Sequence, residues 1–264
     1  MLPGIYNLRH VGGYATLDGR AIRPYALFRS DSLHRLSPEG QSRLLGYGLR
    51  AVIDLRRKEE IIHEPNLLAG LPQIDYRNLS LYDNWREVMP DGPPESVLEM
   101  YQNIVDRCQT AIGQVLCAAA TGPFPLLIHC KVGKDRTGII VALLLAALGI
   151  PQETIIADYA ESQTNLQPLL PELMDAAAAT GINLQRYARL LQSPPEAMMG
   201  LLSHFDQQYG GVNAYLDTCG FTSTRREQLR ANWLTNKPTF TAPVPTSADP
   251  HLPHNDQTGV PRPR

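Results

Sequence analysis

Cysteine is scarce in this sequence, and the few cysteines form no metal-binding or disulfide pattern. The chain of 264 residues has four, which are Cys108, Cys117, Cys130 and Cys219. Their spacing matches none of the paired ligands of a zinc site. A chain of this length can bury a full hydrophobic core, so it needs no disulfide framework. We therefore expect neither a structural zinc ion nor disulfide bonds.

A strong net charge and a long hydrophobic segment are also absent. The formal net charge is −2, which gives no electrostatic reason to expect nucleic acid or a membrane surface as a partner. The longest apolar run, residues 139–150, is too short to span a bilayer. The N-terminus lacks the apolar segment of a signal peptide. These features predict a soluble protein with no integral membrane association.

The most informative stretch is residues 129–138, which read HCKVGKDRTG. An apolar run at 124–128 precedes it and another at 139–150 follows it. This order predicts a short buried strand, a tight loop and a buried helix. Such a loop would gather Cys130 and Arg136 around backbone N–H groups at the N-terminus of the helix. That arrangement can bind a phosphate dianion and attack its phosphorus.

Each residue type in the loop has a chemical reason to be there. The field at a helix N-terminus favours a thiolate, so Cys130 is the candidate nucleophile. Arg136 offers a planar fork of donors for two phosphate oxygens. Gly133 lets the backbone turn close to the ligand. Thr137 could hydrogen-bond the Cys130 thiolate, and His129 is expected to orient the cysteine backbone.

The whole loop is a candidate phosphate-binding element. Its expected phosphate-binding residues run from the position after the cysteine to the arginine: Lys131, Val132, Gly133, Lys134, Asp135 and Arg136. A nucleophilic thiol must stay reduced, which favours a cytoplasmic location. Export by a route without a cleavable signal is left open.

The loop resembles the Cys-x5-Arg loop of the protein tyrosine phosphatase superfamily. Its fuller form, GKDRTG at 133–138, is similar to the bacterial and fungal branch of tyrosine and dual-specificity phosphatases. Further stretches resemble this branch in the same order: NLR at 7–9, GGY at 12–14, DGR at 18–20, LFRSD at 27–31, VIDLR at 52–56 and ADYA at 157–160. His10 and Val132 depart from the branch, which usually has Asp and Ala there.

This resemblance implies a hydrolase that cleaves phosphate monoesters without a metal or other cofactor. Cys130 would attack phosphorus while Arg136 and the loop N–H groups hold the equatorial oxygens. Water would then hydrolyse the cysteinyl-phosphate, and Thr137 would assist departure of the thiolate. The expected substrate is phosphotyrosine in proteins, with phosphoserine and phosphothreonine as further acceptors. A phosphoinositide is the alternative substrate, because Lys131 and Lys134 also occur in phosphoinositide phosphatases of this superfamily.

Two aspartates are candidates for the general acid that protonates the leaving oxygen. Asp135 lies inside the loop, and the resemblance implies an active-site role for it. Asp83 follows a predicted strand, at the position where typical dual-specificity phosphatases keep their acid. We favour Asp135, because the loop motif determines its place.

Two other functional classes are compatible with parts of the pattern. An arsenate-type reductase uses a similar loop but needs resolving cysteines, and none lies close to Cys130 in sequence. A non-catalytic phosphate-binding module would be expected to lack the cysteine or the arginine, and both are present.

Strands separated by helices predict an α/β fold with a mostly parallel central sheet flanked by helices, similar to dual-specificity phosphatases. We expect a small β element at 1–30, strands at 49–55, 74–81 and 123–129, and helices at 37–48, 95–120 and 137–148. Residues 1–234 would form a single phosphatase domain whose C-terminal part, 151–234, is helical. Residues 235–264 are predicted to be a disordered tail.

Three further features have open roles. Asp54 lies at the carboxyl end of a predicted strand, where ligands bind in such sheets, but pairing with Arg56 is an equal alternative. Residues 85–94 could form a flap over the site, and residues 162–200 a lid. For both segments, ordinary connection and packing is the favoured interpretation.

Overall fold

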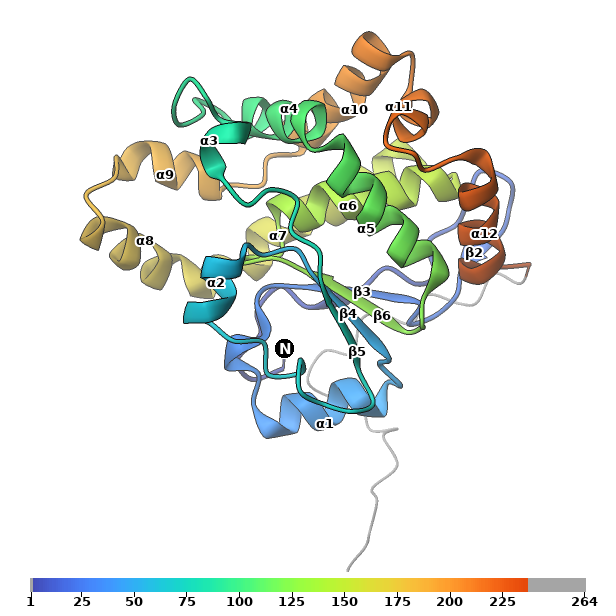
Figure 1. The fold of residues 1–264 in the computed structure, drawn as a ribbon, viewed down its shortest axis with the longest axis horizontal. Coiled ribbons are helices and arrows are strands. Elements are labelled where there is room, and N and C mark those ends of the chain that lie inside the picture. The colour runs from blue at the N-terminus through green and yellow to red at the C-terminus, as the bar shows by residue number, and fades with distance from the viewer. Residues whose placement is uncertain (1, 237–264) are drawn as a thin grey trace, which may run out of the picture.

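A computed structural model describes residues 2–236 of the chain and contains a five-stranded central sheet (Figure 1). The strand order is β1 (Arg9–His10), β3 (Leu27–Ser30), β6 (Leu126–His129), β4 (Ala51–Asp54) and β5 (Asp75–Asn78). Strands β3, β6, β4 and β5 run parallel, and only β1 pairs antiparallel, at the edge. The predicted α/β fold with a mostly parallel sheet is confirmed.

The register of the sheet separates two hydrophobic layers. Leu127 of β6 lies opposite Phe28 and Val52, and these three side chains belong to one buried cluster. The neighbouring position, Ile128, lies opposite Arg29 and Ile53, and both isoleucines belong to the other buried cluster. Side chains that alternate in this way on central strands bury both faces of the sheet, as is usual for parallel strands.

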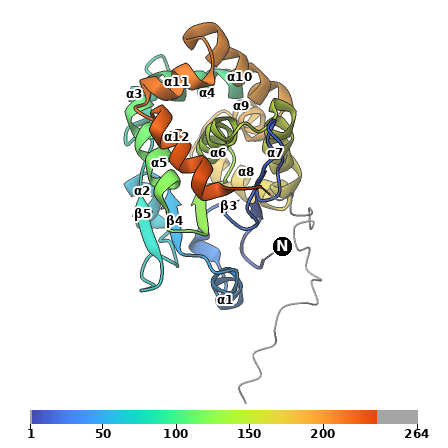
Figure 2. The ribbon, with the colours of Figure 1, turned by 90° about the vertical axis from the view of Figure 1, so that its right-hand side faces the viewer.

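Helices cover both faces. The helix α1 (Pro38–Gly46) lies on one side, and α4 (Val97–Arg107), α5 (Gln109–Thr121) and α6 (Asp135–Leu148) lie on the other (Figure 2). Ser37 caps α1 by accepting a hydrogen bond of 3.0 Å from the Gly40 N–H, and Pro38 follows it at the first helical position. Nearly all of α6 is buried, so this helix forms the centre of its layer. It follows the candidate phosphate-binding segment, residues 130–136, which is called the phosphate loop below.

The helix predicted over residues 95–120 is in fact two helices. Cys108 leaves helical geometry, with φ −110° and ψ 22°, and separates α4 from α5. The two helices pack against different neighbours, α4 against α10 (Pro195–Tyr209) and α5 against α12 (Ser223–Trp233). One straight helix could not follow both contacts, and the hydrophobic periodicity alone did not reveal the break.

The C-terminal part of the domain is helical, as predicted. Besides α10 and α12 it contains α7 (Gln152–Asn165), α8 (Leu170–Ala179), α9 (Leu184–Leu191) and α11 (Val212–Thr218). The short strand β7 (Leu234–Thr235) pairs with β2 (Ala21–Ile22). Thr235, expected in the tail, therefore belongs to a strand, and the rest of the predicted tail, 237–264, lies outside the described residues.

The remaining elements are short. They are the 3-10 helices η1 (Leu33–Arg35) and η2 (Gln167–Leu169) and the helices α2 (Lys58–His63) and α3 (Trp85–Val88). Within residues 2–236, no helix has the length and apolar character needed to cross a membrane.

The first prediction concerns the two-layer core. Leu127 is fully buried, so Leu127→Ala should lower the free energy of unfolding by about 2–5 kcal/mol, through lost burial and a residual cavity. Urea unfolding followed by circular dichroism measures this change. Leu17→Ala is the matched control, because Leu17 is 80% exposed. Equal stabilities of the two variants would contradict the assignment of Leu127 to the core.

Candidate active site

The loop between β6 and α6 adopts the strand–loop–helix arrangement that the sequence predicts. Cys130 directly follows β6 and is buried, and Asp135 is the first residue of α6. Gly133 has φ +67°, and a Cβ atom there would lie 2.1 Å from the Ser30 carbonyl oxygen. Only glycine fits such a conformation next to another backbone segment.

The carbonyl groups of residues 130–133 are all bound from the surrounding structure. The donors are the His129 ring (3.0 Å to the Cys130 oxygen), the Ser32 N–H (2.9 Å to Lys131) and the Asn7 amide (3.0 Å to Val132 and 3.1 Å to Gly133). Across a planar trans peptide, the carbonyl and the following N–H point in opposite directions. The N–H groups of residues 131–134 therefore point away from these donors, as an anion-binding loop requires.

A buried ion network holds the same loop from behind. Arg29 donates to the Gly133 oxygen over 2.9 Å and also pairs with Asp158 of α7. Arg9 pairs with Asp158 over 3.1 Å and donates to the Asn7 side chain over 2.5 Å. Burial acts to raise the pKa of Asp158, but the two arginines hold it below its ordinary value.

The sequence predicted no role for Asn7, Arg9, Arg29 or Asp158, although all four lie in the stretches that carry the resemblance. The available signal was the presence of charged residues inside apolar segments. A charge in such a place is expected to be buried with a partner. The partners are far apart in sequence, so the signal could not say which residues meet.

Arg136 is held at the loop by a second set of contacts. Its guanidinium pairs with both oxygens of Glu60 over 2.7 and 2.8 Å, and it donates to the Leu55 oxygen over 3.2 Å. It also lies 5.7 Å from the centre of the Tyr82 ring. Burial alone would raise the pKa of Glu60, but Arg136 lowers it to about 2. Glu60 and Tyr82 are thus site residues that the sequence did not identify.

Asp135, the favoured general acid, lies among hydroxyl and ammonium groups. Its Oδ1 accepts a hydrogen bond of 2.8 Å from the Tyr101 hydroxyl and lies 3.1 Å from the Lys134 Nζ. The Tyr101 hydroxyl in turn lies 2.9 Å from that of Tyr159. Asp83, the other candidate, is exposed in the turn next to Tyr82.

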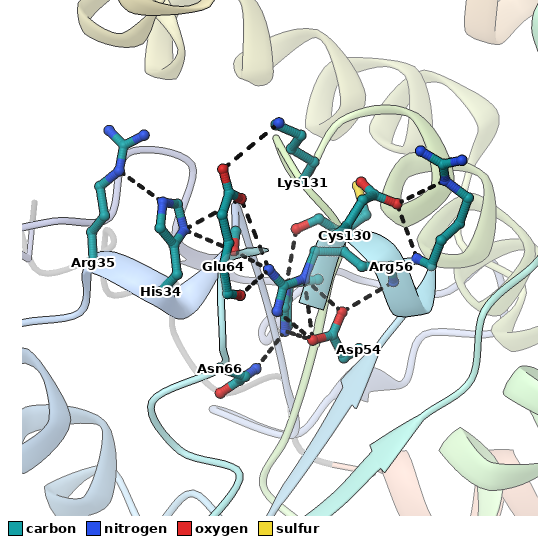
Figure 3. Close-up of polar contacts among 12 residues, drawn as sticks. His34, Arg35, Asp54, Arg56, Glu64, Asn66, Cys130 and Lys131 are labelled. Carbon is teal, nitrogen blue, oxygen red and sulfur yellow. Dashed lines mark hydrogen bonds and ion pairs between the residues drawn. The ribbon is translucent and has the colours of Figure 1, made fainter. Parts of the chain in front are cut away.

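The two loop lysines lie in different environments. Lys131 is half exposed, and its Nζ lies 3.7 Å from Glu64 (Figure 3). Lys134 has a fully buried side chain whose ammonium donates to the carbonyl oxygens of Leu190 and Gln192, the latter over 2.7 Å. The expectation that Lys134 faces the phosphate is therefore not met, because backbone carbonyls of another segment bind its ammonium.

Thr137 also differs from expectation. Its Oγ1 is buried but forms no hydrogen bond to any residue that the structure describes. The expected hydrogen bond to the Cys130 thiolate is accordingly not formed in this structure.

Asp54 and His129 support the loop from below. Asp54 pairs with Arg56 over 2.7 Å (Figure 3) and accepts a hydrogen bond from the Tyr76 hydroxyl over 3.0 Å. These contacts match the alternative in which Asp54 pairs with Arg56 and has no part in binding a ligand. The Nε2 of His129 lies 2.8 Å from the Asn66 amide nitrogen. Because the Asn66 oxygen accepts from the Leu68 N–H over 2.9 Å, the amide donates to Nε2. The Nδ1 of the His129 ring donates to the Cys130 oxygen, because a carbonyl oxygen can only accept, and Nε2 also lies 3.4 Å from the Asp54 carboxylate.

The segments considered as a flap and a lid have regular structure. Residues 85–94 contain the short helix α3 and a turn. The helices α8 and α9 form a hairpin beside the loop (Figure 1). Leucines of η2, α8 and α9 form a buried cluster with Val132 of the loop: Leu169, Leu173 and Leu191, together with Leu166. The hairpin therefore packs on the phosphate loop.

The second prediction follows from the low pKa of Glu60. A carboxylate with a lowered native pKa stabilises the fold above its unfolded pKa, and this contribution is lost as the pH falls toward the native value. The free energy of unfolding of the wild type should therefore fall between about pH 5 and pH 2, by about 3 kcal/mol more than in Glu60→Gln. Urea unfolding at several pH values measures this difference.

The matched control is Glu59→Gln, a neighbouring exposed glutamate in α2. Its pH dependence should match that of the wild type. If Glu60→Gln also matched the wild type, the ion pair between Glu60 and Arg136 would not be stabilising the fold.

The sequence of this chain is similar to those of known proteins. A protein-family model described as "Tyrosine phosphatase family" matches residues 1–235. The chain is 29% identical to the triple specificity protein phosphatase PtpB of Mycobacterium tuberculosis, over 87% of this chain and 96% of that protein. It is 31% identical to a tyrosine-protein phosphatase of Nostoc commune, over 80% of this chain and 74% of that protein. The crystal structure of P. aeruginosa TpbA aligns with a TM-score of 0.32 and 17% identity, over 64% of this chain and 89% of that one.

Proposed function

Because this chain belongs to the tyrosine phosphatase family, we propose that it hydrolyses phosphotyrosine in proteins, and phosphoserine and phosphothreonine as well, through a cysteinyl-phosphate intermediate. The observation that carries the proposal is the orientation of the loop. Its carbonyls at 130–133 are bound on the outer side, so a row of N–H groups can receive phosphate next to Cys130.

In the first step, the Cys130 thiolate attacks phosphorus in line with the leaving oxygen. The loop N–H groups and Arg136 bind the three equatorial oxygens, where charge develops in the transition state. The pairing of Arg136 with Glu60 supports this role, because it orients the guanidinium before substrate arrives. In this chemistry the loop and the arginine supply the positive field.

Asp135 protonates the leaving oxygen in the first step and directs water onto the cysteinyl-phosphate in the second. Its hydrogen bond from Tyr101 and its contact with Lys134 support this assignment, because they hold the carboxylate at the start of α6. Asp83 is the weaker candidate, since it is exposed. In the second step water displaces the Cys130 thiolate from phosphorus, and the Thr137 hydroxyl, which has no other partner among the described residues, donates a hydrogen bond to that thiolate.

A phosphoinositide remains the second candidate substrate. The half-exposed Lys131 favours it, because its ammonium could bind a second phosphate beside the loop. The orientation of Lys134 weighs against it, because its ammonium is occupied by backbone carbonyls. The arsenate-type reductase and the binding module are less consistent with membership in a phosphatase family. We also propose that the protein acts in the cytoplasm, where the Cys130 thiol stays reduced.

The third prediction tests the proposed function directly. In buffer containing EDTA, the wild type should release phosphate from a phosphotyrosine peptide faster than from a phosphatidylinositol monophosphate. Cys130→Ser should abolish both activities but keep phosphate binding, because the loop N–H groups remain. Retained turnover in Cys130→Ser would refute the covalent mechanism, and faster release from the lipid would move the main function to phosphoinositides.

The fourth prediction distinguishes the two candidate acids. Asp135→Asn should lower kcat for a phosphotyrosine peptide by about 10²–10⁴-fold, the usual contribution of a general acid. For p-nitrophenyl phosphate the loss should be smaller, because its leaving group needs less protonation. Asp83→Asn, the matched control, should change kcat by less than about fivefold. A larger loss in Asp83→Asn than in Asp135→Asn would reverse the assignment.

A further inference from the structure

Lys134 of the phosphate loop reaches the C-terminal helical part. Within residues 2–236, no other cationic side chain of the loop is bound by backbone carbonyls of that part. The Lys134 side chain is fully buried, and the ammonium donates to the oxygens of Leu190 and Gln192. Leu190 lies in the last turn of α9, and Gln192 is its C-cap. The last carbonyls of a helix lack partners within the helix and carry partial negative charge. The buried Lys134 ammonium therefore donates hydrogen bonds to carbonyl groups that have no partner within α9.

A second residue of α9 also packs at the loop. Tyr187 lies against the buried cluster that contains Val132, and burial and the charge of Asp135 both raise the pKa of this tyrosine. Lys134 lies 3.1 Å from the same carboxylate. Leu191 adds an apolar contact, because it is buried with Val132 of the loop. Lys134 thus contacts both the Asp135 carboxylate and the C-terminal end of α9.

Among the described residues, the other ion pairs of α8 and α9 with the rest of the protein are exposed, and just beyond α9 the Ser193 N–H donates to the Gln163 side chain over 2.6 Å. Arg35 pairs with Glu172 of α8, and Arg186 of α9 pairs with Glu95. Exposed ion pairs contribute little to stability, because water screens them. A buried ammonium and two carbonyls, in contrast, are costly to separate, because each would be left unpaired.

We propose that the Lys134 side chain positions the site by holding α9 on the phosphate loop and so placing this helix beside Asp135, and that its ammonium does not bind the phosphate. Its effect on turnover rests on the proposed function. Its effect on the attachment of α9 does not.

Hydrogen–deuterium exchange tests the attachment without any need for turnover. In Lys134→Met, which keeps the length of the side chain but removes the donors, exchange of residues 184–193 should rise about tenfold or more. Lys131→Met is the matched control and should leave exchange in this segment unchanged. Unchanged exchange in Lys134→Met would overturn the proposal.

Binding and kinetics distinguish positioning from phosphate binding. Lys134→Met should keep its affinity for vanadate within about threefold of the wild type and lower kcat for a phosphotyrosine peptide several-fold, with a smaller change in KM. A loss of vanadate affinity of about tenfold or more, with exchange at 184–193 unchanged, would make Lys134 a phosphate ligand instead.

A second variant loosens α9 without touching the loop lysine. Leu191→Ala should raise exchange at 184–193 and lower kcat in the same direction as Lys134→Met. In the double variant, kcat should fall by a smaller factor than the product of the factors in the two single variants, because both substitutions weaken the same attachment of α9. If Leu191→Ala frees α9 while kcat stays at the wild-type value, the helix does not position the site and the proposal fails, even where Lys134→Met proves too unstable to study.

Discussion

The site depends on one constraint, which is that the carbonyl groups of the phosphate loop must point outward. A planar peptide cannot direct its carbonyl and the next N–H to the same side. Outward carbonyls buried in protein need donors, because an unpaired buried carbonyl is costly. Asn7, Ser32 and His129 supply these donors from three different parts of the chain. The anion-binding side of the loop is therefore built by groups on its opposite side.

These donors explain the arrangement of the rest of the domain. Asn7 and Arg29 reach the loop because β3 pairs with β6 and β1 pairs with the other edge of β3. Asp158 of α7 pairs with both buried arginines, Arg29 and Arg9, and Glu161 lies 3.5 Å from Arg9 as a second carboxylate. Asn7, Arg9 and Arg29 thus form one buried network with the phosphate loop and α7. Removing one partner from it would leave a charge unpaired.

The same loop makes different use of its charged side chains. Arg136 is oriented by its ion pair with Glu60. Asp135 is held by Tyr101 at the start of α6. Lys134, only one position before it, points to the end of α9. Adjacent residues in a tight loop point in different directions, so charge alone does not tell which of them meets the substrate.

The sequence by itself determined the loop motif at residues 129–138, its strand–loop–helix context, the α/β class of the fold and the helical C-terminal part. These features depend on residues that are close in sequence, such as the cysteine and arginine at fixed offsets and the apolar runs beside them. Only the tertiary structure decided the break at Cys108, the pairing of Glu60 with Arg136, the network around Asp158 and the direction of Lys134. Each of these depends on which distant segments come into contact, and local periodicity and motif spacing carry no information about that.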